Sequence, residues 1–163
     1  MQNIVFQALE ESIRVKEHFI TQNADALVSL AQRLAGCFTS NHKLLLFGNG
    51  GSAADAQHIA AEFVNRFAVE RKPLPALALT TDTSVITSIS NDYSFDDIFS
   101  KQIKALGQKD DMALAISTSG NSRNVILAVE TARELGLYTV GFTGARSQQR
   151  PNSPPPAPVK ATV

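Results

Sequence analysis

The chain has 163 residues, enough for one domain with a buried core but too few for two full domains. Its 15 basic side chains equal its 15 acidic ones, and since residues 145–163 hold three bases and no acid, residues 1–144 carry a net charge of −3. Because phosphate neutralisation requires clustered positive charge, this balance argues against nucleic-acid binding through a broad basic face.

Cysteine usage and hydropathy indicate the compartment. Cys37 is the single cysteine, so no intramolecular disulfide can form, which favours a reducing environment. The N-terminal segment does not resemble a signal peptide, and no apolar run approaches the about 18 residues of a membrane span. We therefore expect a cytoplasmic protein without a membrane partner.

The predicted elements alternate along the chain. Residues 4–37 place apolar side chains at steps of three and four, which predicts two helices that break near residues 21–23. Four short apolar runs then predict strands, and helical patterns lie between and after them. The strands cover 43–47, 76–80, 112–117 and 139–143, and the helices cover 52–68, 83–90, 95–106 and 122–135. This order predicts an α/β fold, a three-layer αβα sandwich with a parallel sheet and N-terminal helices.

The composition changes after Gly144. Residues 145–163 contain five of the seven prolines and few apolar side chains. Proline lacks the N–H that a sheet ladder needs, and few side chains remain to offset the ordering entropy. We expect one domain at 1–144 and a disordered or loosely attached tail at 145–163.

A glycine-rich segment, GNGGS at 48–52, joins the first predicted strand to a helix. Glycine permits tight turns and close approach of the backbone to a ligand, and a helix start offers free N–H groups to an anion. The spacing matches neither the dinucleotide-binding nor the Walker pattern. Taken alone, the segment fits a ligand site and a simple turn equally well.

A second segment, ISTSGNS at 116–122, repeats this layout after the third predicted strand. One hydroxyl at a helix start needs no function beyond capping. Four hydroxyls around one glycine favour a single phosphate instead, and the absence of lysine and arginine from the segment leaves hydroxyls and backbone as its donors. Both segments follow strands, and parallel sheets bind ligands at the carboxyl ends of their strands.

His58 and Glu62 lie one turn apart on the predicted helix at 52–68, opposite its apolar face. This pair fits a solvated helix surface. It also fits a general base, Glu62, with His58 tuning it or binding metal. Because the pair points away from its own core, a catalytic role requires cover by another element or subunit.

These motifs resemble the sugar isomerase (SIS) domain, which is flavodoxin-like, and within it the phosphoheptose isomerases. The resemblance covers residues 1 to about 144 and rests on GNGGS at 48–52, HIAAE at 58–62, SND at 90–92, DDIFSKQI at 96–103 and ISTSGNS at 116–122. It implies a homotetramer that interconverts sedoheptulose 7-phosphate and D-glycero-D-manno-heptose 7-phosphate for lipopolysaccharide heptose synthesis.

The resemblance also implies roles for individual residues. Glu62 is the expected base, forming a cis-enediol, with His58 as its catalytic neighbour. The implied substrate contacts are Asn49, Gly50, Gly51, Ser52, Asn91 and Asp92 for the sugar and Ser117, Thr118, Ser119 and Ser122 for the phosphate. His58 and Glu62 match two zinc-ligand positions of some members, although zinc normally takes three or four protein ligands, so we expect no strongly held metal in this chain.

Two features leave alternatives open. A noncatalytic SIS-domain regulator that binds the bacterial replication initiator protein resembles this chain at NRFAVERKPLPALAL and GNSRNV, but it tends to lack the acid at the position of Glu62 and to interrupt the STS run.

The family pattern also continues beyond FTG at 142–144 with a helix bearing an active-site glutamine and histidine, which residues 145–163 do not match. We therefore expect impaired catalysis.

Overall fold

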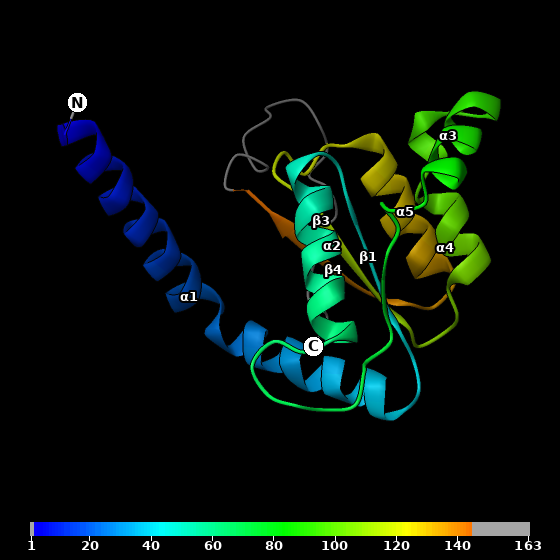
Figure 1. The fold of residues 1–163 in the computed structure, drawn as a ribbon, viewed down its shortest axis with the longest axis horizontal. Helices are drawn as coiled ribbons and strands as arrows, with labels where there is room; N and C mark the ends of the chain where they lie inside the picture. The colour runs from blue at the N-terminus through cyan, green and yellow to red at the C-terminus, as the bar shows by residue number, and fades with distance from the viewer. Residues whose placement is uncertain (1, 145–163) are drawn as a thin grey trace. The chain divides into compact units, whose positions relative to one another are not determined.

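The structure, a computed structural model, describes residues 2–144 (Figure 1). The predicted tail at 145–163 lies outside the described residues. Contacts divide the chain into two compact units, one ending at Arg33 and the other beginning at Leu34. None of the helices in the described range is both long and apolar enough to cross a membrane.

The first unit consists of one helix, which corrects the prediction of two N-terminal helices. Helix α1 (Gln2–Thr39) runs without a break, and its last residues belong to the second unit. At the predicted break, Thr21 Oγ1 donates to Glu17 O at 2.7 Å and Asn23 Nδ2 donates to Phe19 O at 2.8 Å. Both side chains thus bond to the preceding turn of the helix, which accommodates the polar stretch without ending it.

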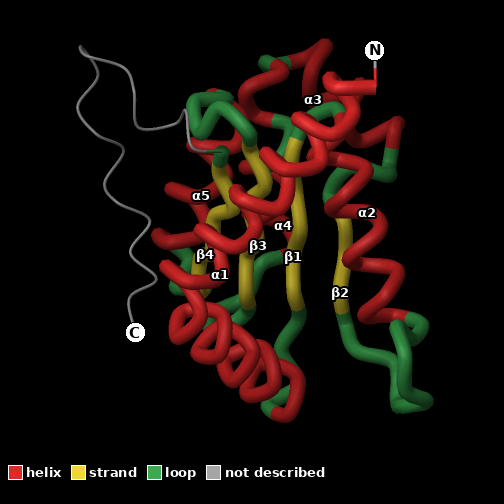
Figure 2. Tube along the Cα trace, turned by 90° about the vertical axis from the view of Figure 1, so that its left-hand side faces the viewer, coloured by secondary structure: helices red, strands yellow, loops and turns green. Residues whose placement is uncertain are grey.

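The second unit is built on a four-stranded parallel sheet with the order β2-β1-β3-β4 (Figure 2). The strands are β1 (Leu44–Gly48), β2 (Ala76–Ala78), β3 (Met112–Ser117) and β4 (Tyr138–Thr143). All four predicted strands are present, and β2 is shorter than its apolar run. In the register of the two central strands, Leu44 pairs with Met112 and Gly48 pairs with Ile116.

Helices cover both faces of this sheet, as predicted (Figure 1). Helix α2 (Gly51–Val64) packs on one face against β1 and β2, and α5 (Arg123–Glu134) packs on the other against β3 and β4. Helices α3 (Thr83–Asp92) and α4 (Ser100–Leu106) are joined by a 3₁₀ turn, η1 (Phe95–Asp97). The predicted helix at 95–106 is therefore two elements.

The predicted helix at 52–68 was too long. A helix that ran to residue 68 would have turned Phe67 toward the apolar face of α2. The helix ends at Val64 instead, and Phe67 lies beyond it, 82% exposed.

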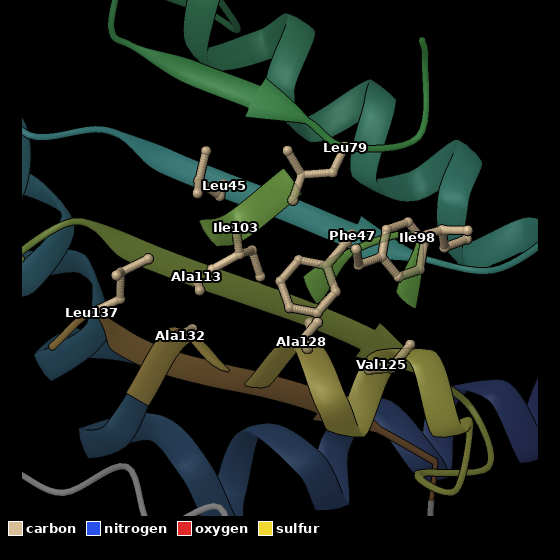
Figure 3. Close-up of a cluster of buried hydrophobic side chains, with 12 residues drawn as sticks. Leu45, Phe47, Leu79, Ile98, Ile103, Ala113, Val125, Ala128, Ala132 and Leu137 are labelled. Carbon is tan, nitrogen blue, oxygen red and sulfur yellow. The ribbon is translucent and has the colours of Figure 1, made fainter. Parts of the chain in front are cut away.

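The sheet has buried apolar side chains on both faces, because successive residues of a strand point to opposite faces. Leu45, Phe47, Ala113 and Ala115 join residues of α4, of α5 and of the segment between η1 and α4 in one buried cluster (Figure 3). The rings of Phe47 and Phe99 pack at a tilt of 36° with their centroids 5.5 Å apart. Leu44, Leu46, Met112 and Leu114 are buried from the other face. The strands that lead into the two predicted loops thus rest on a rigid base.

A buried carboxylate ties the starts of these strands together. Asp111, with a side chain 1% exposed, lies just before β3 and accepts from Lys43 Nζ at 2.6 Å. It also accepts from the backbone N–H of Lys43 at 2.9 Å and of Gln108 at 2.8 Å. Its own carbonyl accepts from Tyr138 N, at the start of β4. Asp111, which directly precedes β3, therefore links the residue before β1 to the first residue of β4.

Cys37 is buried near Asp111, and its Sγ lies 3.6 Å from the carbonyl oxygen of Lys43. Burial, reinforced by the nearby charge of Asp111, raises the pKa of the Cys37 thiol above its ordinary value. The thiol therefore stays protonated at neutral pH and is a structural rather than a reactive cysteine.

We expect Asp111→Ala to lower the free energy of unfolding by about 3 kcal/mol, because it leaves buried N–H donors and a half-buried ammonium without their acceptor. Urea denaturation measures the change, with Glu130→Ala, an exposed site on α5, as the control. Equal denaturation midpoints for the two variants would contradict this role for Asp111.

Candidate active site

The first loop, Gly48–Ser52, connects β1 to α2 in very little space. A Cβ on Gly48 would lie 2.6 Å from Ile116 O and 2.9 Å from Ser52 Cβ, so no larger residue fits there. Gly50 has a φ of 56°, in the left-handed region. Backbone N–H groups of Ser52 and Ala53 then donate to Asn49 O and Gly50 O, which starts the helix. This loop therefore brings a helix N-terminus directly beside the end of β3.

The second loop, Ser117–Ser122, is organised by its own hydroxyls. Ser117 is buried, and its Oγ accepts from Gly120 N at 3.2 Å and lies 3.4 Å from Ser122 Oγ. Gly120 supplies the left-handed turn with a φ of 64°. Ser119 Oγ accepts from Asn121 N at 3.2 Å.

Three hydroxyls of this loop are available to a ligand. Thr118 and Ser119 are exposed, and Ser122 is the N-cap of α5 although its side chain makes no capping hydrogen bond. The hydroxyl of Ser122 is therefore not committed to the helix. Gly144 N donates to Thr118 O, and a Cβ at position 144 would lie 2.6 Å from that oxygen, so the end of β4 supports the loop closely.

Both loops lie at the carboxyl edge of the parallel sheet, as predicted, and the pairing of β1 with β3 brings them together. Asn49 Nδ2 donates to Asn124 Oδ1 at 2.9 Å, and Asn124 Nδ2 donates to Asn49 Oδ1 at 2.8 Å. Asn124 lies in the first turn of α5, is 2% exposed, and was not predicted from the sequence. Nothing in its local pattern identified it, since its partner lies 75 residues earlier.

His58 and Glu62 lie on the outward side of α2. His58 Nε2 is 3.8 Å from Glu62 Oε1, and the two side chains are 72% and 32% exposed. The pair therefore faces away from its own core, as the helical pattern predicted.

The helix end beside Glu62 is held by a residue that the sequence did not suggest. The guanidinium of Arg71 donates to Glu62 O at 2.7 Å and to Phe63 O at 2.8 Å. A cation at a helix C-terminus satisfies carbonyls that lack a partner and complements the helix dipole. Arg71 thus fixes the backbone of the candidate base.

Asn91 and Asp92 are exposed at the C-terminal end of α3. The amide of Asn91 donates to Asp92 Oδ1 at 2.9 Å, so their side-chain hydrogen bond joins them to each other rather than to either loop. Their predicted sugar contacts stay a prediction.

Residues 2–144 do not form a complete zinc site. His58 and Glu62 supply two potential ligands, and the described residues contain no group of three or more histidine, cysteine, aspartate or glutamate side chains placed to hold a metal ion. Since zinc normally takes three or four protein ligands, the described residues do not fit it.

Comparisons with known proteins identify the fold and its relatives. A family model described as the SIS domain matches residues 8–144. The phosphoheptose isomerase of Nitratidesulfovibrio vulgaris strain Hildenborough is 60% identical over 141 residues, which cover 86% of this chain and 68% of that protein. The solved phosphoheptose isomerase of Neisseria gonorrhoeae superposes with a TM-score of 0.83 at 45% identity, covering 90% of this chain and 77% of its own. That of Francisella tularensis has a TM-score of 0.80 at 40% identity, covering 88% and 78%.

Proposed function

Because the chain belongs to the SIS domain family and, within it, to the phosphoheptose isomerases, we propose that it interconverts sedoheptulose 7-phosphate and D-glycero-D-manno-heptose 7-phosphate. The observation that carries this proposal is the pairing of Gly48 with Ile116, which sets the two loops side by side at the carboxyl edge of the sheet. Such an isomerase would supply heptose for lipopolysaccharide synthesis.

The second loop is the proposed phosphate site. Its exposed Thr118 and Ser119, the hydroxyl of Ser122, which makes no capping hydrogen bond, and the N-terminus of α5 offer neutral donors around one position. Ser117, buried below them, orients Gly120 and Ser122. The phosphate is thus bound by hydroxyls and backbone N–H groups.

The first loop is the proposed sugar site. Gly50 and Gly51 are exposed and carry no side chain between the backbone and a bound sugar, and a Cβ on either would meet nothing within 4 Å. Ser52, the second residue of α2, lies buried beside them, and Asn49 lies on the side of the second loop. Asn91 and Asp92 are proposed to contact further sugar hydroxyls.

Glu62 is the proposed general base. Its carboxylate removes the proton from C1 of the ketose and returns it to C2, through a cis-enediol, while a proton passes from the C1 oxygen to the C2 oxygen. The sugar loses and gains one C–H bond, so the reaction needs no oxidant. His58, whose Nε2 lies 3.8 Å from Glu62 Oε1, is proposed to orient that carboxylate.

Glu62 is proposed to act on sugar bound by a second copy of the chain. Glu62 lies ten positions after Ser52 on α2, which corresponds to about 15 Å along the helix axis, so it stands well away from the helix start where the two loops of its own chain meet. Apolar side chains of α1 also stay exposed, among them Phe6 at 61%, Leu9 at 54% and Ile13 at 45%. Exposed apolar surface of this kind favours assembly, and we propose a homotetramer.

We expect Glu62→Gln to lower kcat on sedoheptulose 7-phosphate by about 10²- to 10⁴-fold, because glutamine keeps the shape of the side chain but cannot accept the proton. The matched control is Glu70→Gln, an exposed residue beyond α2 whose carboxylate pairs with Arg66. Turnover that survives Glu62→Gln would remove the catalytic assignment. Because residues 145–163 do not match the active-site helix of the family pattern, turnover by the wild type is itself proposed to be impaired. An inactive wild type that still binds sedoheptulose 7-phosphate would fit this impairment, whereas one that does not bind it would favour the noncatalytic regulator, which stays a prediction.

We expect the double variant Ser119→Asp, Ser122→Asp to lose the thermal stabilisation that sedoheptulose 7-phosphate gives the wild type, since two carboxylates would repel the phosphate. The matched variant Ser119→Asn, Ser122→Asn adds similar bulk without charge and should retain part of the shift. A melting temperature that still rises with ligand in the aspartate variant would place the phosphate elsewhere.

A shared site predicts that two inactive variants complement each other. Co-expressed chains carrying either Glu62→Gln or the two aspartates should recover about a quarter of the wild-type activity, because random pairing across a symmetric interface leaves that share of sites intact. Activity no greater than that of the separate variants would contradict a site built by two copies.

A further inference from the structure

The amide pair between Asn49 and Asn124 is more specific than core packing requires. Each side chain donates to and accepts from the other, at 2.9 and 2.8 Å, and one partner is almost fully buried. Replacing both members of a buried hydrogen-bonded pair by apolar groups of similar shape can be nearly neutral for stability. Stability alone therefore does not explain why two amides lie here.

A neighbouring backbone group fixes the orientation of the pair. Val125 N donates to Asn124 Oδ1 at 2.9 Å, so the oxygen of Asn124 must face the helix start and its nitrogen must face Asn49. This leaves Asn49 one arrangement in which both bonds form. Phe47 and Val125, close to the two asparagines in the chain, lie in the same buried cluster, so both ends of the pair rest on the core (Figure 3).

The pair joins the two loops that we assign to the substrate. Asn49 stands inside the first loop, where its carbonyl also accepts from Ser52 N. Asn124 stands two residues after Ser122, which ends the second loop and whose carbonyl accepts from Val125 N. The distance between the two amides therefore sets the distance between the sugar-binding turn and the phosphate-binding turn.

We propose that Asn124 is a positioning residue that holds Asn49, and with it the Gly48–Ser52 turn, at a fixed distance from the phosphate loop. This inference rests on the proposed sugar-phosphate site. The side chain of Asn49 serves mainly as the partner of Asn124, and the first loop binds the sugar through the backbone that this pair holds in place. A ligand that spans both loops depends on the pair, whereas a ligand confined to the second loop does not.

Two probes separate these cases in the full chain. Isothermal titration measures the Kd of sedoheptulose 7-phosphate, which spans both loops, and of inorganic phosphate, which needs only the second. We expect Asn124→Ala to weaken the binding of the sugar phosphate about tenfold, because the turn that the pair no longer holds must be re-ordered when the ligand binds. The Kd of inorganic phosphate should change by less than about twofold, because Val125 N keeps its backbone acceptor, Ser122 O.

A double-mutant cycle tests whether the residues act through each other. Asn49→Ala should give the same tenfold loss, and the double variant should lose no more than either single one. Asn49→Ala removes the same hydrogen bonds from the loop side of the pair, where a substitution endangers folding less than at the buried Asn124. If the losses instead multiply, Asn49 contacts the sugar independently and the inference is overturned.

Gln102→Ala is the matched control. Gln102 is another buried amide, and its Nε2 donates to Leu79 O at 2.9 Å and Ile98 O at 2.8 Å, outside both loops. Gln102→Ala should lower the unfolding midpoint and leave the ratio of the affinities for sedoheptulose 7-phosphate and inorganic phosphate unchanged. Asn124→Ala with the same pattern, a lower midpoint and an unchanged ratio, would mean a structural role only and would overturn the inference.

The phosphate-loop variant distinguishes this failure from failure of the proposed site. If the Ser119→Asp, Ser122→Asp variant fails to bind either ligand while Asn49→Ala and Asn124→Ala bind both as the wild type does, the proposed site stands and the positioning role falls. If that variant binds both ligands as the wild type does, both proposals fall.

Discussion

Two adjacent parallel strands, β1 and β3, end at the same level of the sheet, with Gly48 opposite Ile116. A side chain at Gly48 would collide with the Ile116 carbonyl, so this close approach requires glycine. The glycine loop and the hydroxyl loop both start from this contact, and α2 and α5 begin immediately after them. A one-residue change of register would turn every buried side chain of the strand to the opposite face and would separate the loops.

The register is fixed from both ends. At the amino edge, Asp111 accepts from the ammonium and the backbone N–H of Lys43 and so joins the starts of β1 and β3. At the carboxyl edge, Asn49 and Asn124 exchange two hydrogen bonds. The apolar cluster between them fills the space but has no directional preference, whereas buried polar groups specify one geometry. The position of the loops thus depends on a small number of oriented polar contacts.

The sequence predicted what short-range pattern and chain order determine. Strands appeared as apolar runs, the loops as glycine and hydroxyl clusters after them, and the outward position of His58 and Glu62 as helical periodicity. Helix ends and long-range partners were harder. The first helix continues through residues 21–23 because its polar side chains bond back to the helix, and α2 stops before Phe67, where Arg71 caps its last carbonyls. The structural roles of Asn124 and Asp111 could not be identified from the sequence, because each depends on a hydrogen-bond partner distant in the chain.

A crystal structure of the chain with sedoheptulose 7-phosphate tests most directly whether the two loops together hold one phosphorylated sugar. We predict the phosphate among the hydroxyls of Ser117, Thr118, Ser119 and Ser122, the sugar along the backbone of Gly50 and Gly51, and the carbonyl end next to a Glu62 carboxylate. Sugar phosphate bound with its phosphate outside the second loop, or with its sugar away from the first, would contradict the account.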